Sequence, residues 1–157
     1  MRILFCGLNP SPASFTSGVA YARPGNRFWP AALAAGVVSV DRDPAHALAH
    51  HGVGFTDLVA RVTSKASELD ASEYVEGLAT LEQSVARLEP GVVCFVGLSG
   101  WRAAVDKLAT AGWQRTDVAG RPVYVMPSTS GLNAHAQLPD LTQHLRTALA
   151  GPPDSTD

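Results

Sequence analysis

Residues 1–14 decide the fold class, and they read Met1-Arg2-Ile3-Leu4-Phe5-Cys6-Gly7-Leu8-Asn9-Pro10-Ser11-Pro12-Ala13-Ser14. Ile3 to Cys6 form a short apolar run, which is typical of a buried strand in a parallel sheet. The glycine, asparagine and prolines that follow are turn formers, so the strand should open into a polar loop. Ligands of open α/β sheets bind beyond the carboxyl ends of strands. We therefore predict that Asn9 lies near a functional site.

The composition indicates one globular domain. The chain has 157 residues, of which 46% are hydrophobic and 17% charged, so it can bury one sizeable core. We assign residues 1–150 to this domain and residues 151–157 to a frayed tail. The apolar run before Gly7 is too short for a signal peptide, and no stretch approaches 18 uninterrupted apolar residues. We therefore expect a soluble, cytoplasmic monomer that does not act at a membrane.

Charge and cysteine content exclude further classes. The formal net charge is −2 and the pI is about 6.2, which argues against a protein that grips nucleic acid mainly by bulk electrostatics. Local pairs, Arg23 with Arg27 or Arg61 with Lys65, could still contact a few phosphates. Cys6 and Cys94 both lie in apolar runs, so we predict buried free thiols, and two cysteines are too few for an iron–sulfur cluster.

Apolar strands and amphipathic helices alternate along the rest of the chain. The Asp70-Ala71-Ser72-Glu73 capping box starts the clearest helix, which ends before Pro90. We expect residues 15–26 to be a functional loop and 52–69 to be irregular, with 52–59 partly extended and 63–68 exposed. Further helices are predicted over residues 27–35, 45–50, 100–111 and 139–149, and Ser99 is expected to cap the third of these. A second strand is predicted over 92–96, and extended stretches over 113–118 and 122–125. This alternation predicts an α/β fold with a largely parallel sheet flanked by helices.

Three familiar motifs are incomplete. The Gly7 turn lacks the lysine and spacing of a P-loop, and no Gly-x-Gly-x-x-Gly is present. Gly97-Leu98-Ser99-Gly100-Trp101 resembles a serine nucleophile elbow, but tryptophan replaces its final glycine. His46 and His50 have a spacing that zinc sites use, yet no third ligand is near them in the sequence. We therefore expect no metal and no nucleotide cofactor.

Three sequence blocks together resemble a known family. They are Phe5-Cys6-Gly7-Leu8-Asn9-Pro10, Pro24-Gly25-Asn26-Arg27-Phe28-Trp29 and Met126-Pro127-Ser128-Thr129-Ser130-Gly131-Leu132. In this order they resemble the mismatch-specific uracil/thymine DNA glycosylases of the uracil-DNA glycosylase superfamily. The resemblance runs from Arg2 to about Leu149. It implies a bacterial, nucleoid-associated enzyme that flips a base out of DNA and cleaves its N-glycosidic bond without a cofactor.

The resemblance also implies roles for the residues that would surround the flipped base. Asn9 matches the catalytic asparagine, whose amide would orient the attacking water, because an amide is too weakly basic to be a general base. Tyr21 matches the aromatic residue that stacks on the flipped base. Leu8 and Ser14 match pocket positions, Leu8 through its backbone and Ser14 near the 5-position of the pyrimidine. Ser14 is typical of the uracil-preferring branch, so we expect uracil opposite guanine to be the best substrate.

The third block implies a device that opens the duplex. Gly131 and Leu132 match the wedge that fills the space left by the flipped base. The bacterial pattern is Asn-Pro-Ser-Gly-Leu-Ser-Arg, whereas this chain has Ser128 at the first position and Ala134 at the last. The resemblance implies that Ser128 contacts the substrate. Asn26 and Arg27 are expected to cap a helix and support the loop.

The substrate range and two alternative functions stay open at this stage. Thymine, ethenocytosine, hypoxanthine and xanthine are further candidate bases, and single-stranded DNA is a second candidate partner beside mispaired duplex. One alternative is a non-catalytic module that binds DNA or a nucleobase. The other is a small serine hydrolase that uses Ser99 as its nucleophile.

Overall fold

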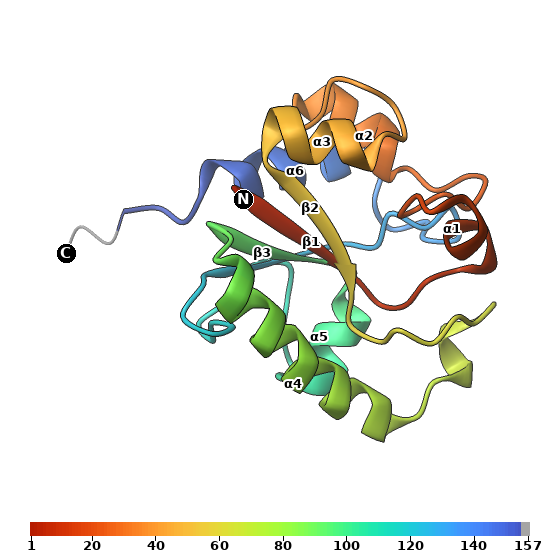
Figure 1. The fold of residues 1–157 in the computed structure, drawn as a ribbon, viewed down its shortest axis with the longest axis vertical. Coiled ribbons are helices and arrows are strands. Elements are labelled where there is room, and N and C mark those ends of the chain that lie inside the picture. The colour runs from red at the N-terminus through yellow and green to blue at the C-terminus, as the bar shows by residue number, and fades with distance from the viewer. Residues whose placement is uncertain (155–157) are drawn as a thin grey trace.

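The computed structural model describes residues 1–154, which form a five-stranded sheet in the order β2-β1-β3-β5-β4 between two layers of helices (Figure 1). Four strands run parallel, and β4 is antiparallel to β5. The strands are β1 (Ile3–Gly7), β2 (Val53–Asp57), β3 (Val92–Val96), β4 (Gly112–Trp113) and β5 (Val123–Met126). The predicted α/β fold with a largely parallel sheet is confirmed.

Alternating side chains along β1 divide the core into two layers. Ile3 and Phe5 point to one face of the sheet, Leu4 and Cys6 point to the other, and each is at most 1% exposed. On the first face pack α2 (Phe28–Ala35), α3 (Pro44–His51) and α6 (Leu138–Ala150), and on the second α4 (Ala71–Leu88) and α5 (Leu98–Ala104). A strand buried on both faces has to be apolar at every position, which is what the sequence of β1 shows.

The clearest sequence signals give correct elements. The capping box forms at the start of α4, where the Glu73 carboxylate accepts a hydrogen bond from the Asp70 N–H at 2.7 Å. Strand β3 covers residues 92–96 as predicted, and α6 extends the predicted last helix by one residue at each end. Cys6 and Cys94 are buried and free, as expected, and burial raises the pKa of both thiols.

Two elements are more regular than the sequence indicated. Strand β2 lies within residues 52–59, which were expected to be only partly extended, because pairing with β1 in parallel register outweighs the weak strand preference of Gly54 and Asp57. A short helix, α1 (Pro12–Ser17), occupies the start of the expected loop. Ser11 caps it, Pro12 stands at its first position, and none of its residues is buried, so it carries no apolar stripe.

The helix after β3 is the third correction. It begins at Leu98 directly after Gly97 and ends at Ala104, well short of Gly112. Ser99 lies inside the first turn and makes no capping hydrogen bond, so its predicted role as the cap is wrong. The extended stretch 113–118 is also shorter than predicted: β4 pairs over two residues, and Val118 bridges Arg121 across the turn.

Within the described residues 1–154, the strands and helices lie between Ile3 and Ala150, and the boundary of the predicted tail at Gly151 stays a prediction. The part of that tail at 155–157 lies outside the described residues. In the described part, 1–154, no helix combines the length and apolar character needed to cross a bilayer. The parallel strands end on the side where α1 lies, and the chain termini lie on the other side (Figure 1).

Candidate active site

Asn9 lies in the loop after β1, and the segment after β2 orients its carboxamide. Asn9 Nδ2 donates to the Arg61 carbonyl oxygen at 2.9 Å and to Thr63 Oγ1 at 2.7 Å. Both N–H groups of the amide are thereby used, which fixes its nitrogen side. Within residues 1–154 no hydrogen bond to Asn9 Oδ1 is present. The oxygen is therefore the side of the amide that can accept a hydrogen bond from water.

Backbone pairing that continues beyond the strands holds these two segments together. Three N–H groups of the later segment donate to carbonyl oxygens of the earlier one. They are Leu58 to Gly7 and Val59 to Leu8, both at 2.9 Å, and Thr63 to Pro10 at 3.3 Å. The parallel ladder thus delivers the Asn9 loop and its orienting residues to the same edge of the sheet.

Thr63 is a site residue that the sequence did not indicate. The stretch 63–68 was expected to be exposed, but Thr63 is only 8% exposed. Its hydroxyl accepts from Asn9 and donates to the Lys65 carbonyl oxygen at 2.9 Å. A threonine in a polar stretch carries no signal for this role, because the contact depends on the pairing of β2 with β1, which was not predicted.

Tyr21 is held in a left-handed backbone conformation, with φ of 57°. Such a conformation costs a residue with a Cβ about 1–2 kcal/mol, so the surroundings must impose it. The Trp29 indole N–H donates to the Ala20 carbonyl at 2.8 Å, and the Ala22 N–H donates to Ser14 Oγ at 3.3 Å. Neighbours on both sides of Tyr21 are therefore fixed.

The Tyr21 ring forms part of an aromatic wall. It stacks on Phe28, with ring centroids 4.4 Å apart and planes 23° apart, and Phe28 is fully buried. The Tyr21 hydroxyl is buried and has no hydrogen-bond partner in the described part of the chain. Tyr21 thus combines packing on the core with partial exposure of its residue at the site.

Ser14 and Leu8 lie beside these groups. Besides binding the Ala22 N–H, the Ser14 hydroxyl accepts from Ser11 Oγ at 3.1 Å, which ties α1 to the Tyr21 segment. The Leu8 carbonyl is taken by Val59, and its side chain reaches toward Gly100 of α5. The predicted contacts of both residues with a pyrimidine stay predictions.

The loop after β5 lies against the segment after Tyr21, and Arg27 joins them. The Arg27 N–H donates to the Thr129 carbonyl at 2.9 Å. The guanidinium donates to the carbonyl oxygens of Ser130 at 2.9 Å, Asn133 at 2.8 Å and Ala136. Asn26 Oδ1 accepts from the Phe28 N–H at 2.9 Å. Loop support by Arg27 is therefore confirmed. The cap position of α2 is Arg27, which makes no side-chain capping hydrogen bond, and Asn26 lies one residue before it and binds only the first N–H of the helix, so the prediction that Asn26 caps the helix is wrong.

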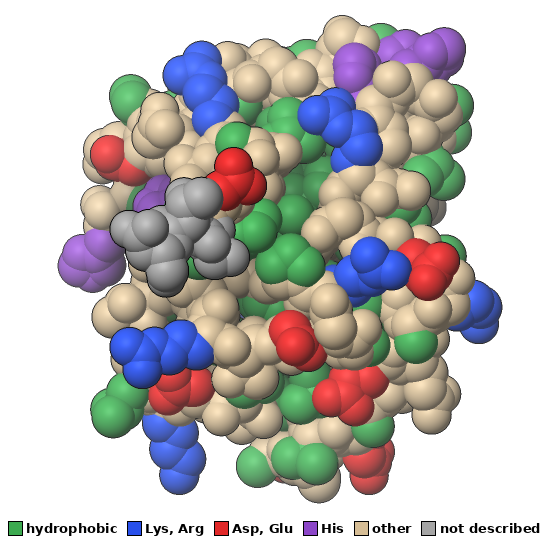
Figure 2. Space-filling model, turned by 90° about the vertical axis from the view of Figure 1, so that its left-hand side faces the viewer, with side chains coloured by type: hydrophobic (Ala, Val, Ile, Leu, Met, Phe, Trp, Pro, Cys, Tyr) green, Lys and Arg blue, Asp and Glu red, His purple; other side chains and the backbone are tan. Residues whose placement is uncertain are grey.

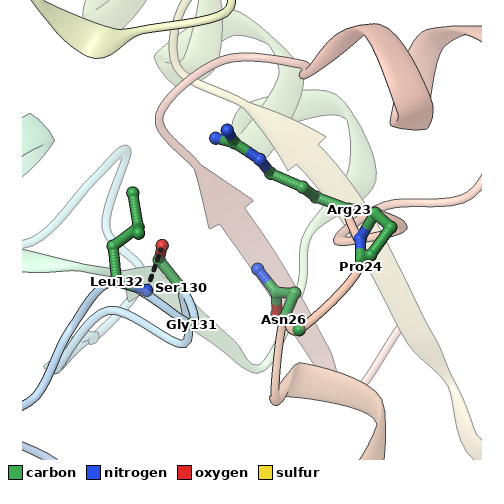
Figure 3. Close-up of a pocket in the computed structure, with 7 residues that line it drawn as sticks. Arg23, Pro24, Asn26, Ser130, Gly131 and Leu132 are labelled. Carbon is green, nitrogen blue, oxygen red and sulfur yellow. Dashed lines mark hydrogen bonds between the residues drawn. The ribbon is translucent and has the colours of Figure 1, made fainter.

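Gly131 and Leu132 form the tip of this loop (Figure 3). A Cβ placed on Gly131 would lie 2.8 Å from the Gly25 carbonyl oxygen, so only glycine fits this approach. Leu132 is 85% exposed, and its N–H donates to Ser130 Oγ at 3.2 Å. A pocket of about 350 Å³ separates the tip from Arg23 and Asn26. The exposure of Leu132 excludes a core role and matches that of a wedge.

Ser128 begins the same loop and lines a larger cavity of about 670 Å³ together with Leu8. Its hydroxyl accepts from the Ser130 N–H at 3.2 Å, and its carbonyl accepts from Asn133 Nδ2 at 2.9 Å. The cavity therefore brings two of the predicted substrate-binding residues to one wall. Ser99 also lines it, but in the described part of the chain no hydrogen bond links Ser99 to a histidine base.

Asp57 is a second site residue that the sequence did not indicate. It ends β2 in register with Gly7, the last residue of β1. A Cβ placed on Gly7 would lie 2.5 Å from Asp57 Oδ1 and 3.4 Å from the Tyr21 hydroxyl. Burial raises the pKa of the Asp57 carboxyl from 3.8 to about 6. A carboxyl group thus lies beside the aromatic wall. Its register partner Gly7 precedes Asn9 by two residues in the chain.

Charge is mixed on one face of the molecule. Figure 2 shows the face at the end of the sheet where the termini lie, and acidic and basic side chains are interspersed on it. Arg61, considered above as a phosphate contact, pairs with Glu73 at 2.8 Å, and this pair lowers the pKa of Glu73 to about 2. Residues 1–154 contain no group of three or more His, Cys, Asp or Glu side chains placed to hold a metal ion.

Comparison with known families agrees with the site. A family model described as the uracil DNA glycosylase superfamily matches residues 1–150. The match supports glycosylase activity on DNA, and the loops that carry Asn9, Tyr21 and Leu132 all lie within it. Because it spans 150 of the 157 residues, the chain belongs to the uracil-DNA glycosylase superfamily.

Proposed function

We propose that the protein is a monofunctional DNA glycosylase that removes uracil mispaired with guanine and leaves an abasic site. The observation that carries this proposal is the fixed amide of Asn9. Its nitrogen donates to Arg61 and Thr63, and its oxygen is left to accept a hydrogen bond. That arrangement suits a group that holds a water molecule at a set position.

The weak basicity of an amide decides the order of events. Asn9 cannot take a proton from water, so the water is a poor nucleophile. The C1′–N1 bond must therefore break ahead of attack, with both electrons leaving on the base and positive charge developing on the sugar. The water oxygen then bonds to C1′, and its proton passes to the base, which leaves as neutral uracil. The rate depends on how well the site stabilises the departing base.

The base has to leave the duplex before this chemistry can occur, and two features support such a step. Tyr21 is fixed from both sides and offers an aromatic surface on which a flipped base can stack. Leu132 is an exposed apolar side chain on a loop that Arg27 braces, so it can fill the space that the base leaves. An opposite guanine is favoured because a mismatched pair is easier to open.

A panel of oligonucleotides tests the proposal. Duplexes with G·U, A·U and G·T pairs, duplexes with hypoxanthine, xanthine or ethenocytosine, and single-stranded uracil are incubated with excess protein and then treated with alkali to cut abasic sites. We expect the fastest product formation from G·U. The Asn9→Ala variant should lose most of this rate while binding the same duplex normally.

Two results would contradict the proposal. If no oligonucleotide gives an abasic site, the protein is not a glycosylase, and binding without turnover would identify a non-catalytic DNA-binding module. If Asn9→Ala retains a near-normal single-turnover rate, Asn9 does not orient the water. A Ser72→Ala variant serves as the control, because Ser72 is exposed at the start of α4 and lines none of the cavities described above, and its rate should equal that of the wild type.

A further inference from the structure

The carboxyl group of Asp57 has no part in the mechanism above, although it lies beside the base-stacking wall. In parallel register with Gly7, it occupies the same face of the sheet as Phe5 and Phe55, the face that Tyr21 covers. The space that a Gly7 side chain would fill is bounded by Asp57 Oδ1 and the Tyr21 hydroxyl. The absence of a side chain at Gly7 therefore leaves this carboxyl facing the aromatic residue.

Neither group is satisfied by the protein. In residues 1–154 no hydrogen bond or ion pair to the Asp57 carboxylate is present, and the buried Tyr21 hydroxyl has no partner. Asp57 is half-buried, so its carboxylate is still open to a ligand. Buried polar groups are nearly always paired, so the unpartnered Tyr21 hydroxyl next to this open carboxylate indicates a ligand that completes the site. A base that stacks on Tyr21 would bring its polar edge to this point.

We propose that Asp57 sets the rate of base release according to its protonation: the neutral acid donates a hydrogen bond to the departing base, and the carboxylate opposes its departure. This inference rests on the proposed glycosylase function. In the bond-breaking step negative charge accumulates on the base, chiefly on its ring nitrogen and carbonyl oxygens. A protonated carboxyl can donate to such an oxygen, whereas an ionised one repels the same charge at short range.

The groups around Asp57 allow its carboxyl to gain or lose a proton near pH 6. Burial raises its pKa to about 6, and no neighbouring cation counters this effect. From the loop after α1 the Tyr21 phenol faces Asp57, and the Cys6 thiol of β1 lies on the other face of the sheet but close enough to interact with it electrostatically. Burial raises the pKa of both groups, so both stay neutral near pH 6. On the α4 side the nearest charged groups are those that line the cavity next to the end of β2, namely the paired Arg61 and Glu73, and Glu76.

The test measures single-turnover excision of uracil from a G·U duplex between pH 5.5 and 8.5, for the wild type and for Asp57→Asn. An asparagine cannot ionise and has N–H donors, so it imitates the neutral acid. We expect the wild-type rate to rise about tenfold or more as the pH falls from 8.5 to 5.5, with an inflection near 6. Asp57→Asn should be independent of pH in this range and faster than the wild type at pH 8.5.

A change of leaving group sharpens the readout. Fluorine at the 5-position of uracil withdraws electrons and stabilises the departing anion, so this base needs less help from the site. The wild-type pH dependence should therefore be smaller with 5-fluorouracil than with uracil. Glu76→Gln is the matched control: it removes one negative charge from the neighbouring cavity, and it should keep both the rate and the pH profile of the wild type.

The outcomes distinguish an error in the role of Asp57 from an error in the proposed glycosylase function. If Asp57→Asn keeps the wild-type pH profile, or is no faster at pH 8.5, the role of Asp57 is wrong while the glycosylase function stands. If the wild type excises no base at any pH, the proposed function fails and this role fails with it. Binding of each variant to a duplex with a non-cleavable 2′-fluorinated uridine should be unchanged, and weaker binding by Asp57→Asn would mean that its effect is structural.

Discussion

Nδ2 of Asn9 lies 2.7 Å from Oγ1 of Thr63, although the two residues are 54 positions apart in the chain. The contact exists because β1 and β2 are neighbours in the sheet and their parallel pairing continues into the loops. Thr63 in turn donates to Lys65, so its own hydrogen is used and its lone pair faces Asn9. The orientation of the proposed water-holding amide is thus set by a residue that need not touch DNA.

Replacing Thr63 tests this positioning role. Thr63→Val keeps the shape of the side chain but removes the acceptor, so Asn9 can rotate and misplace the water. We expect the single-turnover rate on G·U to fall on the order of 10- to 100-fold, with duplex affinity unchanged. Thr63→Ser restores the hydroxyl and should recover most of the rate. If Thr63→Ser is as slow as Thr63→Val, the hydroxyl is not what positions Asn9.

Leu132 is suited to a test that separates duplex opening from chemistry. Leu132→Ala should slow excision from a G·U duplex by about tenfold or more, because an alanine cannot fill the vacated stack. Excision from single-stranded uracil should be unchanged, since there is no stack to open. Leu108→Ala is the control, because Leu108 is 87% exposed in the loop after α5. Equal losses on both substrates would contradict a wedge role.

Arg27 should matter for stability through the carbonyl groups that it binds. Arg27→Met leaves three backbone oxygens of the loop after β5 without their donor. We expect the free energy of unfolding to fall by about 3 kcal/mol in urea titrations. Arg23 is exposed, and Arg23→Met should change the stability by less than about 0.5 kcal/mol. An Arg27→Met protein as stable as the wild type would show that the brace contributes nothing to folding.

The raised pKa of Asp57 also predicts how stability depends on pH. The folded chain binds this proton more tightly than the unfolded chain, so the group lowers the free energy of unfolding as the pH rises from about 4 to about 6. Asp57→Asn should therefore stabilise the protein at pH 8, by about 2 kcal/mol, and have little effect at pH 4. The exposed Asp117 offers the control Asp117→Asn. Thermal or urea unfolding at both pH values measures the difference, and an equal effect of Asp57→Asn at pH 4 and pH 8 would contradict it.

The sequence predicted those parts of the fold whose signals are local. An apolar run such as Ile3 to Cys6 can only be a buried strand or part of a buried helix, and the turn residues after it favour the strand. The capping box of Asp70 and Glu73 is likewise a local signal, because four consecutive residues specify it. The sequence indicated only a partly extended stretch at β2, because Gly54 accommodates the Met1 side chain and the pairing with β1 supplies the stability that the residues of β2 lack.

The same distinction applies to the site. Asn9 and Leu132 were predicted because each lies in a block with a recognisable pattern, and Tyr21 because it lies in the loop between the first two blocks. Thr63 and Asp57 were missed because their roles arise from the end of β2, where residues of no particular pattern meet the Asn9 loop. Arg27 was assigned correctly to loop support, since its block is adjacent to a helix start that the sequence marks clearly.

The Arg27 brace also orders events while the chain is being made. Arg27 leaves the ribosome 103 residues before Ser130, the first carbonyl that its guanidinium binds. A growing chain that has reached Thr63 already contains both partners of the Asn9 amide, yet its DNA-opening loop has not been synthesised. The contacts that brace this loop can therefore be completed only in chains whose translation has passed Ala136.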